Sequence, residues 1–257
     1  MDLNHVTVMT TTYNGLPFLK EAVESVLAQT AVTLQYIVVD DGSTDETAVY
    51  LQSLKDPRLL ILQPGRVGRA NALNLAVQAA TAPFIANLDA DDMMLPGRLA
   101  AQANFLAQNP DVGLVGSAVL WQTADGQQET RTFLPDDARL RRRLFTGYPF
   151  AHSAVMYRRA AIEQAGGFDP TLPCALDYDL CCRIAIHARL ANLPQPLVVR
   201  RVHGGNFFMQ QISPGQYVRA LWHIKWKYWL ARGRPFTLLP RLIATTISSG
   251  VRKWRSS

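Results

Sequence analysis

The pattern of apolar and polar positions predicts a regular alternation of strands and helices in the first hundred residues. Apolar positions recur at helical spacing over residues 16–27 and 68–80. Short apolar runs rich in β-branched residues predict strands over residues 5–10, 34–39, 58–62 and 84–88. Strands that alternate with helices in this way favour an α/β fold with a mainly parallel, doubly wound sheet and helices on both faces.

The second half of the chain shows a less regular pattern. Helices are expected after Pro96, over residues 137–145 and in the segment that begins at Ala175. Further strands are expected over residues 112–121, 152–157 and 197–202, with a hairpin turn at Asp125-Gly126. A last helix is predicted between about Pro214 and Arg232.

Polar residues follow the predicted strands at the points where the strands end. Residues 11–15 follow the first strand, residues 40–47 follow the second, and Asp89, Asp91 and Asp92 follow the fourth. Ser43 or Thr44 is expected to cap the helix after the second strand. Because ligands of open α/β sheets bind at the carboxyl ends of the strands, these segments are expected to share one site.

The three carboxylates at residues 89–92 repel one another and require a cation to neutralise them. Oxygen ligands of this kind suit Mg²⁺ or Mn²⁺, often together with substrate phosphates. The alternative is a solvated loop before a helix that starts at a proline, but the apolar flank on the strand side disfavours it. The segment therefore predicts a metal–diphosphate site.

Composition is consistent with one large α/β domain, with or without an appendage. The chain has 257 residues, of which 48% are hydrophobic and 18% are charged. Cys174, Cys181 and Cys182 show no paired metal-ligand spacing, so neither a zinc site nor a disulfide framework is expected. The sequence shows no signal peptide pattern and no apolar run of about 20 residues, so a cytoplasmic location is expected.

The charge is unevenly distributed, and this raises the question of a partner for the C-terminal part. Residues 180–257 hold thirteen Lys and Arg and no Asp or Glu. The helix expected after Pro214 mixes these cations with Trp222, Trp226 and Trp229. Its apolar stripe predicts either a core face that packs on the domain or contact with an anionic membrane surface on the inner face of the cell membrane. Nucleic acid is not expected as a partner, because it leaves the acidic strand ends unexplained.

Five short motifs in order resemble the GT-A glycosyltransferases of glycosyltransferase family 2. They are Thr12-Tyr13-Asn14, Val39-Asp40-Asp41-Gly42-Ser43, Asp89-Ala90-Asp91-Asp92, Gly166-Gly167-Phe168-Asp169 and Asp177-Tyr178-Asp179-Leu180. The resemblance covers about residues 4–206. It implies a GT-A domain over residues 1–211, with a nucleotide-binding half to about 110 and an acceptor half from about 111, followed by a basic helical tail over 212–257.

The resemblance also implies an activity, namely metal-dependent, inverting transfer of a sugar from a nucleotide-sugar donor. The expected donor is a UDP- or dTDP-sugar, the expected cofactor is Mn²⁺ or Mg²⁺, and the expected acceptor is a glycan or a lipid-linked glycan of a surface polysaccharide. A non-catalytic nucleotide-sugar binder is the alternative. A sugar-nucleotide pyrophosphorylase is disfavoured, because those enzymes usually carry a Gly-rich loop after the first strand, where this chain has residues 11–14.

Residue roles on the donor side follow from the same resemblance. Thr11, Tyr13 and Asn14 would border the nucleobase and ribose, and Asp41 with Asp40 would contact the uracil or thymine edge. Arg69 would lie near the base or the diphosphate. Asp89 would face ribose or metal, Asp91 would bind the metal, Asp92 would belong to the donor site, and His203 would lie near the diphosphate or metal.

On the acceptor side, Asp177 would be the general base that deprotonates the acceptor hydroxyl. The family often has Glu before this Asp, whereas here Leu176 precedes it. Structural interpretations stay open beside the functional ones: Asp40-Ser43 as a turn, Asp177 as a helix-start carboxylate and His203 as an exposed loop residue. Structural roles are expected for Asp179 and His152, and packing for Cys181-Cys182.

Overall fold

The computed structural model describes residues 3–16, 18–202, 212–233, 243–246 and 248. The family-derived site residue His203 lies outside these residues. In chain order the described elements are β1 (His5–Thr12), α1 (Phe18–Leu27), β2 (Thr33–Asp40), α2 (Thr47–Ser53), β3 (Leu59–Leu62), α3 (Arg69–Ala79), β4 (Phe84–Asn87), β5 (Met93–Met94), α4 (Arg98–Gln108), β6 (Val112–Gln122), β7 (Gln128–Arg131), α5 (Asp137–Leu144), a 3₁₀ turn (His152–Ala154), β8 (Met156–Arg158), α6 (Arg159–Ala165), α7 (Leu176–His187), β9 (Arg189–Arg201) and α9 (Pro214–Ala231).

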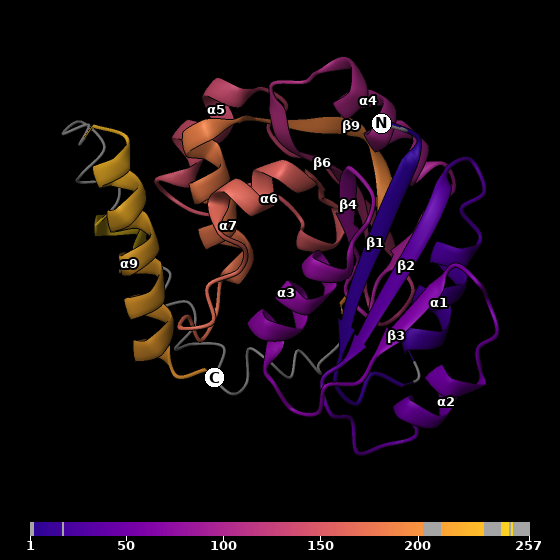
Figure 1. Ribbon diagram of the computed structural model, residues 1–257. Coiled ribbons are helices and arrows are strands. Elements are labelled where there is room, and N and C mark those ends of the chain that lie inside the picture. Colours follow the sequence, from indigo (N-terminus) through magenta and orange to yellow (C-terminus); the bar gives the residue numbers. More distant parts are fainter. Residues whose placement is uncertain (1–2, 17, 203–211, 234–242, 247, 249–257) are drawn as a thin grey trace.

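The described strands form one sheet in the order β3-β2-β1-β4-β8-β6-β9-β5, with β7 paired to β6 (Figure 1). Strands β3, β2, β1 and β4 pair in parallel. Strand β8 then runs antiparallel between β4 and β6, and β9 is parallel to β6. The expected α/β fold with a doubly wound sheet is confirmed, with antiparallel pairs confined to the part beyond β4.

Helices cover both faces of the sheet because the side chains of each buried strand alternate between two cores. In β1, Val6 and Val8 join the core that contains α1, α2 and α4, whereas Met9 joins the core that contains α3, α6 and α7. In β2, Tyr36 and Val38 join the first of these cores, and Ile37 joins the second. A strand buried on both faces needs a continuous apolar run, which explains why the strand pattern was clear in this half.

Several expected elements differ from those in the structure. Thr11 lies inside β1 and not in the turn after it, and residues 152–157 form a 3₁₀ turn followed by β8. Ser43 and Thr44 do not cap α2, which begins at Thr47 without a side-chain cap. Ser43 instead accepts a hydrogen bond from the backbone of Asn14 (2.9 Å), so the loop serves tertiary contact and not helix capping.

The C-terminal helix α9 packs beside α7 at the edge of the molecule (Figure 1). Leu221, Ile224 and Tyr228 are buried in the same core as α3 and α7, so the prediction of an inward-packing face is confirmed. Trp229 is also buried, whereas Trp222 and Trp226 are exposed. In the part of the chain that the structure describes, no helix is long and apolar enough to cross a bilayer.

Gly42 lies between β2 and α2, where its loop packs closely on the loop after β3. Its φ is +77°, and a Cβ atom there would lie 2.9 Å from the backbone nitrogen of Arg66. Gly65 has a similar φ of +80° but has nothing within 4 Å of an added Cβ. We expect Gly65→Ala to cost roughly 1–2 kcal/mol for the left-handed backbone, and Gly42→Ala to cost an additional 1–3 kcal/mol, roughly, for the overlap. Urea unfolding of both variants measures the difference, and equal losses would contradict the packing.

Candidate active site

The three carboxylates after β4 form one cluster at the carboxyl edge of the sheet. One oxygen each from Asp89, Asp91 and Asp92 lies within 4.8 Å of the others. Two oxygens bound to one Mg²⁺ or Mn²⁺ at about 2.1 Å lie at most about 4.2 Å apart, so the spacing of the cluster is close to the spacing that one cation requires. An all-oxygen set of this kind suits a hard divalent cation, and the residues therefore fit the expected metal.

Asp89 is held by cationic and polar groups from distant parts of the chain. Its Oδ1 accepts a hydrogen bond from Nη2 of Arg69 (2.8 Å) and lies 3.2 Å from Nδ1 of His152. Its Oδ2 accepts a hydrogen bond from the hydroxyl of Ser153 (3.0 Å). Burial acts to raise the pKa of Asp89, but the charges of His152 and Arg69 and these hydrogen bonds hold it well below its ordinary value. Asp89 is therefore an ionised carboxylate in a fixed orientation.

Asp92 is the most buried member of the cluster, and both of its oxygens have protein partners. Oδ1 accepts a hydrogen bond from the backbone nitrogen of Arg201 in β9 (2.9 Å), and Oδ2 contacts the Ser153 hydroxyl. Burial raises the pKa of Asp92 to about 7, and the charges of Asp91 and Asp89 act in the same direction. These contacts favour a role for Asp92 in holding the loop in place, while its donor-binding role stays a prediction.

One hydroxyl proton on Ser153 cannot be donated to two carboxylates at once. A protonated Asp92 resolves this conflict, because its O–H donates to Ser153 while Ser153 donates to Asp89. The high pKa of Asp92 and the low pKa of Asp89 fit this order of donors.

Arg98 provides a buried cation near the carboxylates. It has no exposed surface, and its guanidinium donates to the backbone oxygen of Asn87 (2.8 Å) and to Gln102 (3.0 Å). Burial lowers the pKa of Arg98 to about 9, while the nearby charges of Asp92 and Asp89 act to raise it. The cluster thus has a permanent counter-charge that no substrate can reach.

The expected nucleobase end of the site lies where β2 ends, and its carboxylate Asp41 is fixed by the loop after β3. Asp41 Oδ1 accepts hydrogen bonds from the backbone nitrogens of Val67 (2.7 Å) and Gly68 (2.9 Å). Its Oδ2 pairs with Arg66 (2.7 Å), and the Arg66 guanidinium lies 3.7 Å from the centre of the Tyr13 ring. Asp41 and Tyr13 are thus joined through Arg66, as expected for two residues of one site.

Asn14 and Asp40 are occupied largely by contacts that shape these loops. The Asn14 side-chain oxygen accepts a hydrogen bond from the backbone of Thr44 (2.7 Å), with φ of Asn14 at +52°. Asp40 is buried and accepts a hydrogen bond from the backbone of Ser43 (2.9 Å). These contacts support the structural interpretation of both residues, and their donor contacts stay predictions. Thr11 is half-buried and pairs with Val39 within the sheet.

Asp177 lies in the first turn of α7 and is half-buried. The charge of Asp177 acts on the phenols of Tyr148 and Tyr157, whose hydroxyl oxygens are buried. Burial raises the pKa of both phenols well above 10, and the charges of Asp177 and Asp89 both add to that shift. Asp177 and Asp89 therefore act on the same interior region, although they lie on different elements.

Four residues of this arrangement were not predicted as part of the site, namely Arg66, Arg98, His152 and Ser153. His152 was expected to be structural, whereas its ring lies against Asp89 and its Nε2 is buried without a hydrogen-bond partner among the described residues. Only the order of strands β4 and β8 in the sheet brings His152 and Ser153 to Asp89, and the sequence pattern carries no signal for that order.

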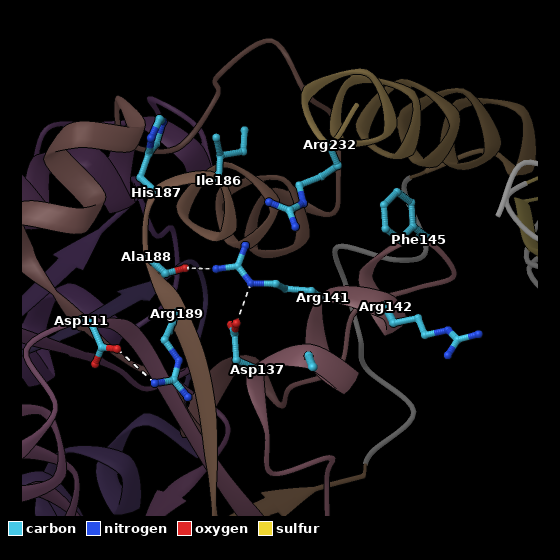
Figure 2. Close-up of a pocket in the computed structure, with 11 residues that line it drawn as sticks. Asp111, Asp137, Arg141, Arg142, Phe145, Ile186, His187, Ala188, Arg189 and Arg232 are labelled. Carbon is cyan, nitrogen blue, oxygen red and sulfur yellow. Dashed lines mark hydrogen bonds and ion pairs between the residues drawn. The ribbon is translucent and has the colours of Figure 1, made fainter. Parts of the chain in front are cut away.

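A cavity of about 760 Å³ lies elsewhere, between α5, the end of α7 and the end of α9 (Figure 2). None of the residues that line it is a predicted site residue. Arg141 crosses this region, pairs with Asp137 (2.7 Å) and donates to the backbone oxygens of Ala185 and Ala188. Arg189 pairs with Asp111 (3.0 Å). These contacts join the elements around the cavity, and the lining residues Arg142 and Arg232 add further cations.

The titration of Asp92 predicts a pH dependence of stability in metal-free protein. Because the pKa is raised from 3.8 to about 7 in the folded state, the stabilising contribution of the protonated form is lost as pH rises through that interval. Asn at this position keeps an acceptor for Arg201 and a donor for Ser153 without titrating. We therefore expect Asp92→Asn to gain stability relative to the parent chain between pH 5 and pH 8, measured by urea unfolding with chelator.

Asp125→Asn is the control for this comparison. Its carboxylate is exposed, and a hydrogen bond from the Thr123 hydroxyl lowers its pKa below 3.8, outside the tested interval. If the free energy of unfolding of both variants changed with pH in the same way relative to the parent chain, the buried Asp92 would not be the cause of the pH dependence.

Comparison with known proteins places this arrangement in a family. A sequence model described as Glycosyl transferase family 2 matches residues 7–166. A hyaluronan synthase of Pasteurella multocida is 25% identical over 224 residues, which cover 81% of this chain and 21% of the synthase. An amylovoran biosynthesis glycosyltransferase of Erwinia amylovora is 26% identical over 207 residues, which cover 79% of this chain and 76% of that protein. An uncharacterised glycosyltransferase of Haemophilus influenzae is 28% identical over 215 residues, and the chain spans 66% of its length.

Solved structures show the same fold. The crystal structure of residues 1–349 of Staphylococcus aureus TarS with UDP-GlcNAc has a TM-score of 0.72 and 20% identity, covering 86% of this chain and 65% of that one. A mannosyltransferase of Pyrobaculum calidifontis with GDP-Man and Mn²⁺ has a TM-score of 0.64 and 22% identity, covering 96% of this chain and 75% of that one. The described fold and the family match over more than half of the sequence agree, and the chain belongs to glycosyl transferase family 2, with a GT-A fold.

Proposed function

We propose that this chain transfers a sugar, with inversion, from a UDP- or dTDP-sugar to a glycan or lipid-linked acceptor of surface polysaccharide synthesis. The observation that carries the proposal is the cluster of Asp89, Asp91 and Asp92 at the sheet edge that also holds Asp41 and Tyr13. A nucleoside diphosphate requires two kinds of contact. The carboxylate cluster can hold the cation that its diphosphate needs, and Tyr13 and Asp41 offer a stacking ring and a hydrogen-bond acceptor for its nucleobase.

The names of the relatives support the substrate class. A hyaluronan synthase, a chondroitin synthase and an amylovoran biosynthesis enzyme all make polysaccharides, and TarS was solved with UDP-GlcNAc. The mannosyltransferase, by contrast, was solved with GDP-Man, so the nucleotide has to be tested directly. Asp41 fits uracil or thymine, because a carboxylate accepts the N3–H that both bases present, but guanine also presents N–H donors, so Asp41 alone does not select the nucleotide.

On the donor side, the proposal assigns the cation to Asp91 and Asp89, with Mn²⁺ or Mg²⁺ stabilising the charge that grows on the departing diphosphate. Arg69 lies at the start of α3, and its guanidinium is one-third exposed while it pairs with Asp89. It can therefore donate to a diphosphate oxygen without losing its own anchor. Ser153 and Arg98 keep the carboxylates in place and do not contact the donor.

On the acceptor side, Asp177 takes the proton of the attacking hydroxyl. The hydroxyl oxygen forms a bond to the anomeric carbon as the bond from that carbon to the diphosphate oxygen breaks, and the electron pair leaves with the diphosphate. One displacement inverts the anomeric centre, and no covalent nucleophile of the enzyme is needed. The half-buried position of Asp177 at the start of α7 leaves its carboxylate accessible to an acceptor.

The Leu176 departure has a packing explanation. Leu176 is buried in the same core as Tyr178 and Leu180, where a carboxylate would require its own partner. Leu176 thus contributes to packing here, and the proposal keeps Asp177 alone as the general base. The alternative of a non-catalytic nucleotide-sugar binder predicts donor binding without transfer to any acceptor.

Release of nucleoside diphosphate from a panel of nucleotide-sugars, with and without Mn²⁺, tests the donor and the cation together. We expect release from a UDP- or dTDP-sugar that chelator abolishes and Mn²⁺ restores. Asp91→Asn should lower the activity by at least about ten-fold, because one ligand charge is lost. Asp111→Asn, which removes a surface carboxylate near the Figure 2 cavity, should not change it. Release that is indifferent to chelator, or occurs only from GDP-sugars, would contradict this proposal.

Two variants in the first turn of α7 test the assignment of Asp177 as the general base. Asp177→Asn should keep the donor affinity and reduce the transfer rate by about 10²–10⁴-fold, because general base catalysis contributes that much. Asp179 is buried and pairs with Arg183 (2.6 Å), so Asp179→Asn should lower stability while transfer by the folded protein continues. Calorimetry with donor and a transfer assay give the two readouts, and parental transfer rates in Asp177→Asn would refute the assignment.

A further inference from the structure

The outer face of α9 carries large apolar side chains that the described protein does not cover. Trp222 and Trp226 are each 38% exposed, and Leu230 is 40% exposed. The three lie four residues apart, on one stripe of the helix. The rings of Trp222 and Trp226 stack with their centres 5.7 Å apart, and Trp226 stacks on the buried Trp229 at 4.8 Å. The exposed tryptophans thus form a preorganised apolar ridge, which we call the α9 ridge.

The opposite face of α9 is fully committed to the protein, so the exposure of the ridge is not a sign of a detached helix. Tyr228 packs on Phe145 with ring centres 4.8 Å apart, and Ile224 is buried in the core. Lys225 is completely buried and donates to the hydroxyls of Thr245 (3.0 Å) and Thr246 (3.2 Å). The helix also begins with a complete capping box at Ser213 and Gln216. The ridge is therefore held in one orientation.

Cations surround the ridge, and no carboxylate of its own helix balances them. Arg219 and Lys227 are exposed beside the tryptophans, and Arg232 ends the helix. The sequence has no acidic residue after Asp179. At the end of α9 the lining of the Figure 2 cavity adds Arg142, and neither Arg142 nor Arg232 pairs with a carboxylate among the described residues. The surface is apolar at its centre and has an excess of cations around it, with the Asp169 carboxylate near Lys227.

We propose that the α9 ridge binds the surface of an anionic lipid bilayer. Tryptophan prefers the boundary between headgroups and acyl chains, and long cationic side chains reach from there to the headgroup phosphates. A second copy of this chain fits the ridge poorly, because two surfaces rich in cations would repel each other. A nucleic acid would engage the cations but would not require two stacked tryptophans on a helix face. The ridge and its charges together match only a surface that is both apolar and anionic.

Binding through α9 would orient the acceptor half of the site toward the membrane. Helix α9 packs directly on α7, and α7 carries Asp177 in its first turn. A lipid-linked acceptor held in that bilayer would then be close to the acceptor half of the site. This consequence rests on the proposed function, whereas membrane binding itself does not, and the two can fail separately.

Flotation of the full chain with vesicles tests the proposal without any activity readout. Vesicles of equimolar phosphatidylglycerol and phosphatidylcholine are compared with vesicles of phosphatidylcholine alone. We expect the protein to float with the anionic vesicles and much less with the neutral ones. The double variant Trp222→Ala, Trp226→Ala should lower the partition coefficient by about ten-fold or more. Arg219→Gln with Lys227→Gln should lower it by about thirty-fold, since two cations near an anionic surface contribute roughly 1 kcal/mol each.

Matched controls come from the other end of the molecule. Val49→Ser with Leu60→Ser removes exposed apolar side chains of α2 and β3, and Lys20→Gln with Lys55→Gln removes exposed cations. Neither pair should change flotation, and unchanged urea unfolding shows that each variant is folded. Equal flotation of the tryptophan variant and the parent would overturn the proposal. So would tight binding of the parent to RNA that the tryptophan variant retains, with no binding to anionic vesicles.

Discussion

The crowding of three carboxylates at the end of β4 is the constraint on which the rest of the site depends. Like charges within 4.8 Å repel, and burial makes that repulsion stronger. The protein offsets it with Arg69 from α3, Arg98 from α4 and His152 from the turn before β8. Each of these groups comes from a different element, so the sheet order has to be complete before the cluster is stable.

The hydrophobic pattern predicted the parallel half of the fold because its strands are short, continuous and buried on both faces. Residues 5–10, 34–39 and 84–88 all lie largely within observed strands. The predicted positions of polar residues after these strands placed Asp41 and Asp89 on one edge, since parallel neighbours end side by side. The sequence pattern therefore predicts this edge of the sheet, because it is built from consecutive strand–helix–strand units whose connections are right-handed.

The remainder of the site could not be predicted, because its contacts depend on long-range strand order. Ser153 reaches Asp89 and Asp92 only because β8 enters the sheet beside β4 in the antiparallel direction. Nothing in the residues near Ser153 distinguishes it from an ordinary buried serine such as Ser117. Lys225 illustrates the same limit, since a lysine on an amphipathic helix is usually exposed, and only the position of Thr245 and Thr246 explains its burial.

At the proposed nucleobase end of the site, some contacts of Asp41 come from the backbone and others from a surface side chain. The backbone nitrogens of Val67 and Gly68 hold Asp41 whether or not a donor is bound, because they belong to the entry of α3. The Arg66 side chain is half exposed, yet it lies on the Tyr13 ring and pairs with Asp41. A nucleobase that stacks on Tyr13 must displace this guanidinium or stack on its outer face. In the proposed donor complex the backbone contacts to Asp41 stay in place, and the nucleobase contact requires the movement of one surface side chain.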